Sequence, residues 1–200
     1  MSDVDKQQRW STWRRNVVDK YKGMPVERIR DDLRSTAHPF SVLMEHWHGD
    51  FNISTLIRNA NVFNAERVFY LGRRGFDRRG TVGAHHYVDL NHLSSIENLL
   101  EFSDQYTLVA LDNNISDCIS LTDFEWPQRP LMIFGEEGTG ITDTVLDICD
   151  HRVSIPQWGS IRSLNVGTSS GIVMYDYVNK LYAGKRNHLS PTLGIQNDTY

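Results

Sequence analysis

Short apolar runs alternate between Phe40 and Tyr182 with segments whose apolar residues recur at helical spacing. Strands that alternate with helices favour an α/β fold, a mostly parallel sheet with helices on both faces. We expect strands at residues 41–44, 67–71, 106–111, 131–134 and 152–155, and helices at residues 52–63, 95–102, 142–148 and 165–182. Because ligands bind beyond the carboxyl ends of such strands, we expect a site in the loops after Met44, Phe134 and Ile155.

The flanks differ from this core. Residues 10–22 carry aromatic and aliphatic side chains at helical spacing, and Pro25 can begin a second helix with its own apolar stripe. Residues 185–200 are polar and carry Pro191 and Gly194. We therefore predict an N-terminal helical extension (1–39), one core domain (40–183) and a C-terminal tail (184–200).

Composition narrows the class of protein. No apolar run approaches the roughly 18 residues of a membrane span, and the polar N-terminus does not resemble a signal peptide, so we expect a cytoplasmic protein with no membrane partner. The two cysteines and eight histidines lack metal-ligand spacing, so we expect reduced thiols and no metal. The net charge of -4 means that any nucleic-acid contact must use a local basic patch.

Residues 151–182 read as a strand, a glycine-bearing polar loop and a long helix. Such a junction can bind a polar or anionic ligand with free backbone groups at the start of the helix. Ser163 and Asn165 fall at the helix start, where they could serve only as caps. After the strand at 131–134 comes FGEEGTGI, whose glycines allow a close backbone approach to a ligand. Its two carboxylates, Glu136 and Glu137, suit a ligand that is partly cationic or that offers hydrogen-bond donors.

Two other stretches complete the set of candidates. Asn52 begins NISTLIRNAN and has helix-capping chemistry, and Arg58 interrupts the apolar pattern of the same helix. That arginine either extends to the surface or is held inward to contact a phosphate or a developing oxyanion. The stretch RRGFDRRGTVGAHH is the clear basic patch of the chain. It is either a solvated loop or a phosphate-contacting surface formed by Arg73, Arg74, Arg78 and Arg79.

Taken together, these stretches resemble the SpoU/TrmH-type branch of the SPOUT RNA methyltransferases over about residues 40–183. The family motifs are N-x5-R-x4-F, then a strand with G-x-E-x-x-G, then I-P followed by S-L-N and a helix. They are matched here by Asn52, Arg58 and Phe63, by Gly135, Glu137, Gly138 and Gly140, and by Ile155, Pro156, Ser163, Leu164 and Asn165. The sequence departs from the family at Glu136, where Asn is frequent, at Thr168 and Ser169, where Ala or Ser-Ala is usual, and at Asn64.

The resemblance implies a C-terminal trefoil knot, S-adenosylmethionine as cofactor, a homodimer, and methylation of a ribose 2′-hydroxyl in RNA. It implies catalytic roles for Arg58 from the second subunit, Asn52, Glu137, Ser163 and Asn165. It also implies a cofactor site formed by Leu111, Gly135, Glu137, Gly140, Ile155, Ser163 and Leu164. The family mechanism makes Arg58 a general base. Because a guanidinium almost never deprotonates, we expect it to stabilise charge instead.

Three alternatives remain open. The chain could be a catalytically silent RNA-binding module of the same fold, although Asn52, Arg58, Glu137, Ser163 and Asn165 are all present. It could methylate a base, but its motifs resemble the ribose branch. The substrate could be ribosomal RNA, whereas the extension and tail resemble those of tRNA-modifying members, which favours tRNA. In that case the arginines of the extension could help to hold the RNA.

Overall fold

The computed structural model describes residues 15–48 and 51–183 of the chain. In chain order its strands are β1 (His38–His46), β2 (Ala65–Gly72), β3 (Leu90–Leu93), β4 (Thr107–Leu111), β5 (Ile119–Ser120), β6 (Pro130–Phe134) and β7 (His151–Ser154). Its α-helices are α2 (Val26–Ser35), α3 (Asn52–Val62), α4 (Ile96–Ser103), α5 (Asp143–Leu146) and α6 (Val166–Tyr182). Short 3-10 helices are η1 (Asp19–Tyr21), η2 (Arg78–Thr81) and η3 (Ala84–His86).

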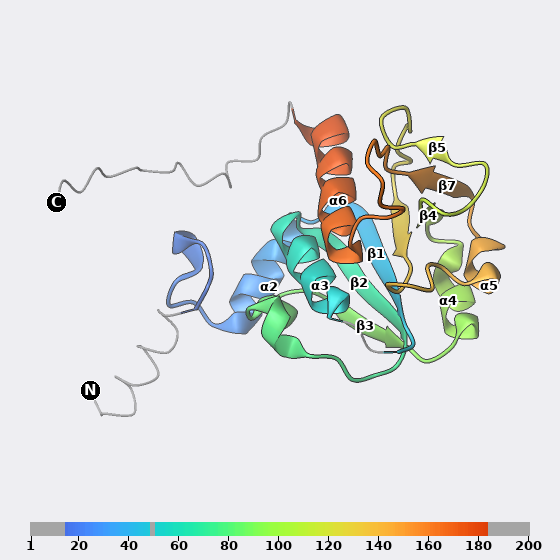
Figure 1. Ribbon diagram of the computed structural model, residues 1–200. Helices are drawn as coiled ribbons and strands as arrows, with labels where there is room; N and C mark the ends of the chain where they lie inside the picture. The colour runs from blue at the N-terminus through green and yellow to red at the C-terminus, as the bar shows by residue number, and fades with distance from the viewer. Residues whose placement is uncertain (1–14, 49–50, 184–200) are drawn as a thin grey trace, which may run out of the picture.

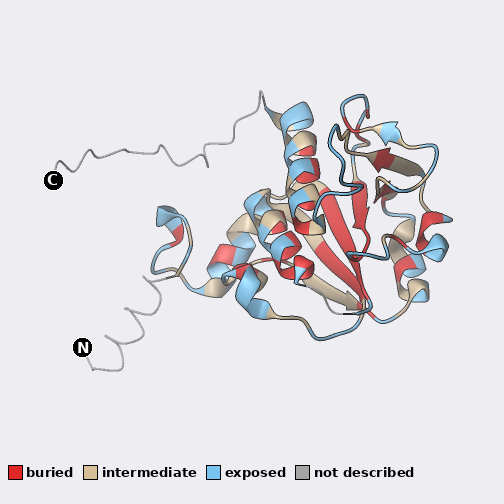
Figure 2. Cartoon of the chain, viewed as in Figure 1, coloured by how far each residue is buried: buried red, intermediate tan, exposed pale blue. Residues whose placement is uncertain are grey.

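The strands form one seven-stranded sheet in the order β3-β2-β1-β6-β4-β7-β5. Every neighbouring pair is parallel, so the carboxyl ends of all strands lie at one edge. The central strands β1 and β6 are buried almost throughout, as Figure 2 shows. The predicted α/β fold is therefore confirmed. The C-terminal trefoil knot stays a prediction.

Two apolar cores lie on opposite faces of this sheet (Figure 1). On one face, α3 and α6 pack against alternate residues of the strands, including Val42 and Met132. On the other face, α4 and α5 cover the intervening residues, including Leu43 and Ile133. The period of two along a strand explains this division, since successive side chains point to opposite faces.

Helices α3 and α6 approach each other closely near the start of α6. The side-chain amide of Asn59 donates to the Gly167 carbonyl at 2.9 Å and to Ser170 Oγ at 3.0 Å. A Cβ atom at Gly167 would lie 2.8 Å from Thr55 Cβ, which is too close, so only glycine permits this packing. The start of α6 is therefore held against the middle of α3.

The N-terminal region differs from the prediction. The expected helix at 10–22 lies partly outside the described residues, and its described part forms only η1. Tyr21 is buried there, and its hydroxyl donates to Asp32 on α2 at 2.6 Å. This tertiary contact and the left-handed Gly23 (φ 79°) fix the segment in a compact turn instead of a longer helix. The second predicted helix is confirmed as α2, whose preceding residue is Pro25.

The strands also differ in detail from the prediction. β1 begins at His38 and includes Pro39, and the pairing with β2 shifts register between His38 and Ser41. A strand tolerates proline at such an irregularity, because no ladder hydrogen bond is needed there. The sequence did not predict β3 or β5. Both are edge strands with mostly half-buried or exposed residues, so they lack the apolar run that marks a central strand.

Within the described residues, no helix is long and apolar enough to cross a membrane. No group of three or more potential metal ligands was found in the same part of the chain. The division of the chain at residues 39 and 183 stays a prediction, and the tail at 184–200 lies outside the described residues.

Candidate active site

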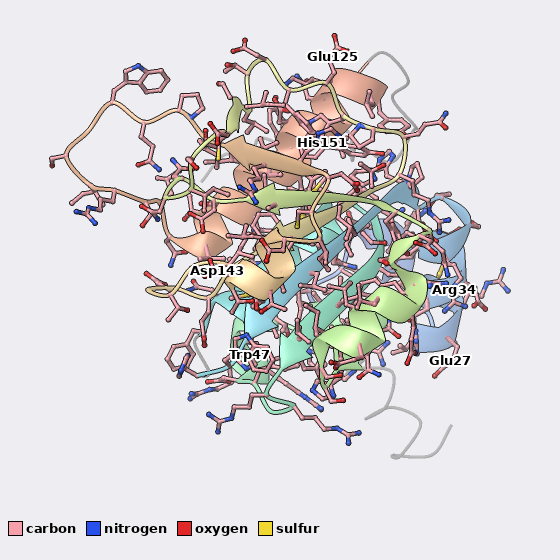
Figure 3. The ribbon with its side chains drawn as sticks, turned by 90° about the vertical axis from the view of Figure 1, so that its right-hand side faces the viewer. Glu27, Arg34, Trp47, Glu125, Asp143 and His151 are labelled. Atoms are coloured by element: carbon pink, nitrogen blue, oxygen red, sulfur yellow. The ribbon has the colours of Figure 1, made fainter. Side chains whose placement is uncertain are left out.

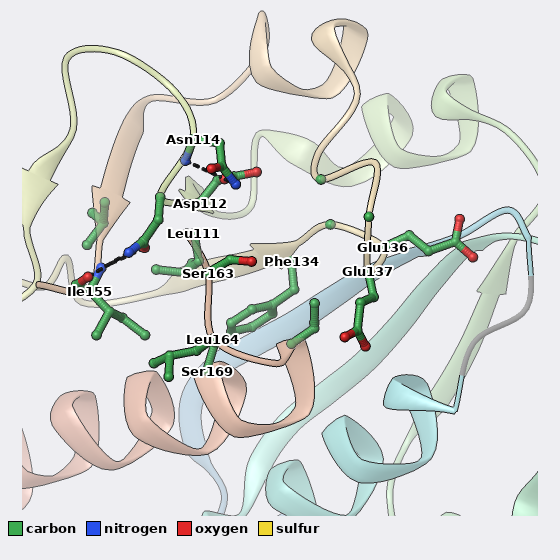
Figure 4. A pocket seen from close by; sticks show the side chains of 16 residues that line it. Leu111, Asp112, Asn114, Phe134, Glu136, Glu137, Ile155, Ser163, Leu164 and Ser169 are labelled. Carbon is green, nitrogen blue, oxygen red and sulfur yellow. Dashed lines mark hydrogen bonds between the residues drawn. The ribbon is translucent and has the colours of Figure 1, made fainter. Parts of the chain in front are cut away.

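A cavity of about 120 Å³ opens at the carboxyl edge of the sheet, where β4, β6 and β7 end (Figure 4). It collects residues from loops that are far apart in the sequence. All seven residues predicted to bind a cofactor line it: Leu111, Gly135, Glu137, Gly140, Ile155, Ser163 and Leu164. The topology thus brings the predicted set together, as the position of ligand sites in parallel sheets leads one to expect.

The glycine-rich turn after β6 forms one wall of this cavity. Glu136 N–H donates to the Gly140 carbonyl at 3.2 Å, and Gly140 N–H donates to the Glu136 carbonyl at 2.9 Å. Gly140 has φ 73°, which disfavours a larger residue. A Cβ atom at Gly135 would lie 2.1 Å from the backbone of Gly140, so glycine at 135 lets the turn close on itself.

A second wall comes from Asp112, Asn113 and Asn114 after β4, which the sequence analysis missed. The side chain of Asn113 accepts from Ile155 N–H at 3.0 Å and donates to the Ile155 carbonyl at 2.7 Å. Asp112 accepts from Asn114 N–H at 2.8 Å and faces the glycine-rich turn. The polar triplet directly after an apolar strand was the signal that could have revealed this wall.

The third wall is the loop from β7 to α6. Ser163 and Leu164 are exposed and face the cavity. Asn165 caps α6, since its side-chain oxygen accepts from Thr168 N–H at 3.2 Å. The capping interpretation of Asn165 is therefore right, but it is incomplete, because the same side chain makes two further contacts.

Asn52, Glu137 and Asn165 form a hydrogen-bonded triangle beside the cavity. Asn165 Nδ2 donates to Asn52 Oδ1 at 2.8 Å and to Glu137 Oε2 at 3.0 Å. Asn52 Nδ2 also donates to Glu137 Oε2. The N-cap position of α3 is Phe51, so the capping interpretation of Asn52 is wrong. Its side chain is held at the site instead, and each of the three motifs contributes one corner of the triangle.

The carboxylates give the cavity an acidic lining. Asp112, Glu136 and Glu137 all line it. Glu136 is 3% exposed, and its carboxylate turns to the loop after β1, where it accepts from His48 N–H at 2.7 Å. Asp112 and Glu137 line the cavity while they also accept hydrogen bonds from neighbouring groups, and their negative charge suits a ligand that carries positive charge.

The structure does not bring Arg58 to the cavity. It is exposed on α3 and is absent from the residues that line the cavity. Val62, one turn further along α3, is 68% exposed, and Tyr175 on α6, whose ring contacts that of Phe63, is 60% exposed. Within a single chain, Arg58 therefore extends to the surface, which is the first of the two positions that the sequence allowed.

The four arginines predicted to bind RNA are all exposed. Arg73 and Arg74 follow β2, whereas Arg78 and Arg79 belong to η2. Arg79 forms an ion pair with Asp77 at 2.5 Å, and this contact lowers the pKa of the Asp77 carboxyl to about 2. Arg79 is therefore partly neutralised, which leaves the other three as the stronger candidates for contact with phosphates.

The two thiols do not take part in this site. Both cysteines are free, and neither lines the cavity. Burial raises the pKa of the Cys149 thiol to about 12 and also raises the pKa of Cys118. The nucleophilic thiolate is therefore scarce at neutral pH for both residues.

Comparison with known proteins identifies the family. The profile of the SpoU rRNA methylase family matches residues 39–175. The chain belongs to this family. Among curated relatives, a tRNA (guanosine(18)-2'-O)-methyltransferase of Aquifex aeolicus is 21% identical over 156 residues, which cover 76% of this chain and 74% of the relative. The Thermus thermophilus enzyme of that name is 25% identical, with coverage of 74% and 79%.

Solved structures of the family share the fold. The SpoU methyltransferase AviRb from Streptomyces viridochromogenes, in complex with AdoMet, has a TM-score of 0.65 at 25% identity and covers 72% of this chain. The chain spans 58% of that protein's length. The A. aeolicus TrmH/SpoU tRNA-modifying enzyme has a TM-score of 0.69 at 20% identity, with coverage of 80% and 83%. The predicted membership of an RNA methyltransferase family is thus confirmed.

Substitution of Asn165 separates its role as a cap from its role in the triangle. Asn165→Asp keeps the cap, because Asp and Asn cap helices equally well, whereas Asn165→Ala loses about 0.5–2 kcal/mol of stability. Asn165→Asp also places a carboxylate against Glu137 and Asn52 Oδ1. We therefore expect the Asp variant to be the more stable and the less active of the two, as measured by thermal unfolding and methyl transfer. If the Asp variant is both more stable and more active than the Ala variant, Asn165 acts only as a helix cap.

Proposed function

We propose that this protein transfers a methyl group from S-adenosylmethionine to a ribose 2′-hydroxyl of RNA. The observation that carries the proposal is the triangle of Asn52, Glu137 and Asn165 beside a cavity lined by all seven predicted cofactor residues. A silent RNA-binding module has no need to hold three polar side chains of three separate motifs in mutual contact.

The lining of the cavity fits the proposed cofactor. Leu111, Phe134 and Ile155 supply apolar walls for a flat ring, and the glycine-rich turn brings backbone close to a ligand. Asp112 and Glu137 provide negative charge for the ammonium and sulfonium groups. When bound, the cofactor supplies an electrophilic methyl group on sulfur. Leu111, Gly135, Gly140, Ile155 and Leu164 would hold it, together with Ser163.

The chain's own residues would position the substrate and stabilise charge. A 2′-hydroxyl is a weak nucleophile that must approach in line, so orientation accounts for much of the acceleration. Asn52 is fixed by Glu137 and Asn165, so it can orient a ribose without reorganising. Arg58 would stabilise the developing oxyanion and the neighbouring phosphate as a permanent cation.

Arg58 would reach the cavity from the second subunit of a homodimer. It is exposed in one chain and lies outside the cavity, and the exposed apolar residues near it suit burial in an interface. Ile172 and Tyr175 on α6 and Val62 on α3 are such residues, with exposed fractions of 38%, 60% and 68%. A twofold interface over this face would bring the same helices of both copies together.

The substrate class is the finer part of the proposal. We favour tRNA, because tRNA (guanosine(18)-2'-O)-methyltransferases of three or more bacteria are among the similar curated proteins. Ribosomal RNA is the second candidate, because an rRNA methyltransferase from Sinorhizobium meliloti shares the fold, with a TM-score of 0.64.

The deciding experiment incubates the protein with methyl-labelled S-adenosylmethionine and separate pools of unmodified tRNA and ribosomal RNA. We expect a 2′-O-methyl nucleoside in the tRNA pool after digestion. Label in the ribosomal pool alone would overturn the substrate class and keep the reaction. Label on a base would overturn the reaction, and absence of both transfer and cofactor binding would favour the silent module.

Mixing inactive variants tests whether Arg58 acts across the dimer. Arg58→Ala should abolish turnover while sparing cofactor binding, because Arg58 does not line the cavity. Arg58→Ala mixed with Asn165→Asp should regain roughly a quarter of wild-type activity, because half of the dimers are mixed and each has one intact site. Mixing Arg58→Ala with itself is the control. No recovery from the mixture would place Arg58 in its own chain's site.

Neutralising the arginine loop, residues 73–79 after β2, tests its interaction with phosphates. Replacing Arg73, Arg74 and Arg78 by Gln should weaken RNA binding and reduce the slope of log K against log salt by about 0.7–0.9 for each phosphate that is no longer neutralised. Arg79→Gln should have the smallest effect, since its charge is paired with Asp77. If the triple variant has the same salt slope as the wild type, these arginines do not contact phosphates and belong to a solvated loop.

A further inference from the structure

Trp47 occupies a distinctive place at the carboxyl edge of the sheet. It directly follows β1, which lies between β2 and β6. Trp47 and His48 therefore leave the sheet between the arginine-bearing segment after β2 and the glycine-rich turn after β6. Trp47 is 42% exposed, and Figure 3 labels it near the lower edge of the molecule.

Two buried carboxylates hold this exposed residue in place. The indole Nε1–H donates to Glu45 Oε1 at 3.0 Å, and Glu45 is fully buried. The backbone N–H groups of Trp47 and His48 donate to the Glu136 carboxylate at 3.3 Å and 2.7 Å. Buried carboxylates are costly unless hydrogen-bonded, and Glu45 is itself fixed by Thr142, whose N–H and hydroxyl donate to it at 2.7 Å and 2.8 Å. The orientation of the ring is therefore fixed.

The indole also rests on the backbone of Gly72. A Cβ atom at Gly72 would lie 2.7 Å from Trp47 Cε3 and 2.9 Å from the His46 carbonyl, so a larger residue would displace the ring. Gly72 has φ 111°, a conformation that glycine adopts without strain. The ring is thus supported by backbone on one side and remains partly open to solvent.

The neighbouring arginines are presented from an equally fixed backbone. Arg73 N–H donates to the His46 carbonyl at 2.7 Å, directly before Trp47 in the chain. The Tyr70 hydroxyl donates to the Arg74 carbonyl at 3.3 Å, and His46 Nε2 lies 3.1 Å from the Gly75 carbonyl. Both guanidinium-bearing residues are exposed. The backbone that carries these two exposed arginines therefore begins directly after Gly72, the residue on which the fixed ring rests.

We propose that Trp47 stacks on an unpaired nucleobase of the RNA substrate while Arg73 and Arg74 contact the flanking phosphates. This inference rests on the proposed function, to which it adds recognition of a single-stranded segment. Aromatic rings stack on bases that are free of a duplex, and adjacent arginines neutralise the backbone. Pre-fixing the ring reduces the entropy cost of binding.

The test compares Trp47→Ala with Trp47→Phe, which keeps an aromatic ring. Leu100→Ala is the matched control, because Leu100 is a similarly exposed apolar residue (47%) on α4 and does not line the cavity. Binding is measured by fluorescence anisotropy with a labelled single-stranded oligonucleotide and a duplex of equal length. We expect Trp47→Ala to raise the single-strand Kd roughly 5- to 150-fold, corresponding to the removal of one base stack. Trp47→Phe should retain most of the affinity.

Three further results should accompany that change. Duplex affinity, the salt slope and the Kd for S-adenosylmethionine should stay at wild-type values in Trp47→Ala, because a neutral ring outside the cavity was removed. Equal single-strand affinity for Trp47→Ala and the wild type would overturn the inference. So would an equal decrease in affinity for both RNAs together with a lower thermal midpoint, which indicates a structural role.

The outcomes also separate this inference from the proposed reaction. Trp47-dependent binding of single-stranded RNA without methyl transfer would keep the inference and overturn the reaction. Methyl transfer whose kcat and KM are unaffected by Trp47→Ala would keep the proposed reaction and overturn the inference about Trp47. A wild-type protein that binds neither RNA would overturn the inference and leave the exposed indole to a protein partner.

Discussion

Parallel pairing of the strands is the constraint on which the site depends. It places the ends of β1, β4, β6 and β7 at one edge, although these strands span residues 38–154. The loops that leave this edge are then close enough for side chains to join them. Glu137, which accepts from both Asn52 and Asn165, links three such segments at one carboxylate oxygen. A charged acceptor strengthens both hydrogen bonds, so the contact is worth more than a neutral one.

The acidic residues at this edge divide into two groups. Glu45 and Glu136 are buried and hold backbone or side-chain donors of neighbouring loops. Asp112 and Glu137 face the cavity. Positive charge is placed elsewhere, in the arginine loop after β2. In the proposed function, this separation would allow a cationic cofactor and a polyanionic RNA to meet at one edge of an acidic chain without competing for the same charges.

Much of the fold could be predicted, because α3, α6 and the central strands carry regular apolar patterns. The edge strand β3 could not, since Asn91 and His92 give it no such pattern. The motifs named seven residues that line the cavity, but they did not include Asp112 and Asn113. These two residues contact Ile141 and Ile155, which are near in space and distant in sequence. The same holds for Glu136, whose partner His48 lies 88 residues away. The local sequence shows the hydrogen-bonding groups of these side chains, but it does not show which distant residues they contact.

The geometry of helix α3 supports the proposal that Arg58 acts from a second subunit. Asn52 begins the helix at the triangle, and Arg58 follows six residues later. At about 100° per residue, the two side chains differ by roughly 120° around the helix axis, so both cannot point into one cavity. Burying the face of Asn52, Leu56 and Ala60 against the core necessarily turns Arg58 outward. In the proposed homodimer, the same helix would hold Asn52 at the site of its own chain and present Arg58 to the site of the other copy, and twofold symmetry would return the same contribution.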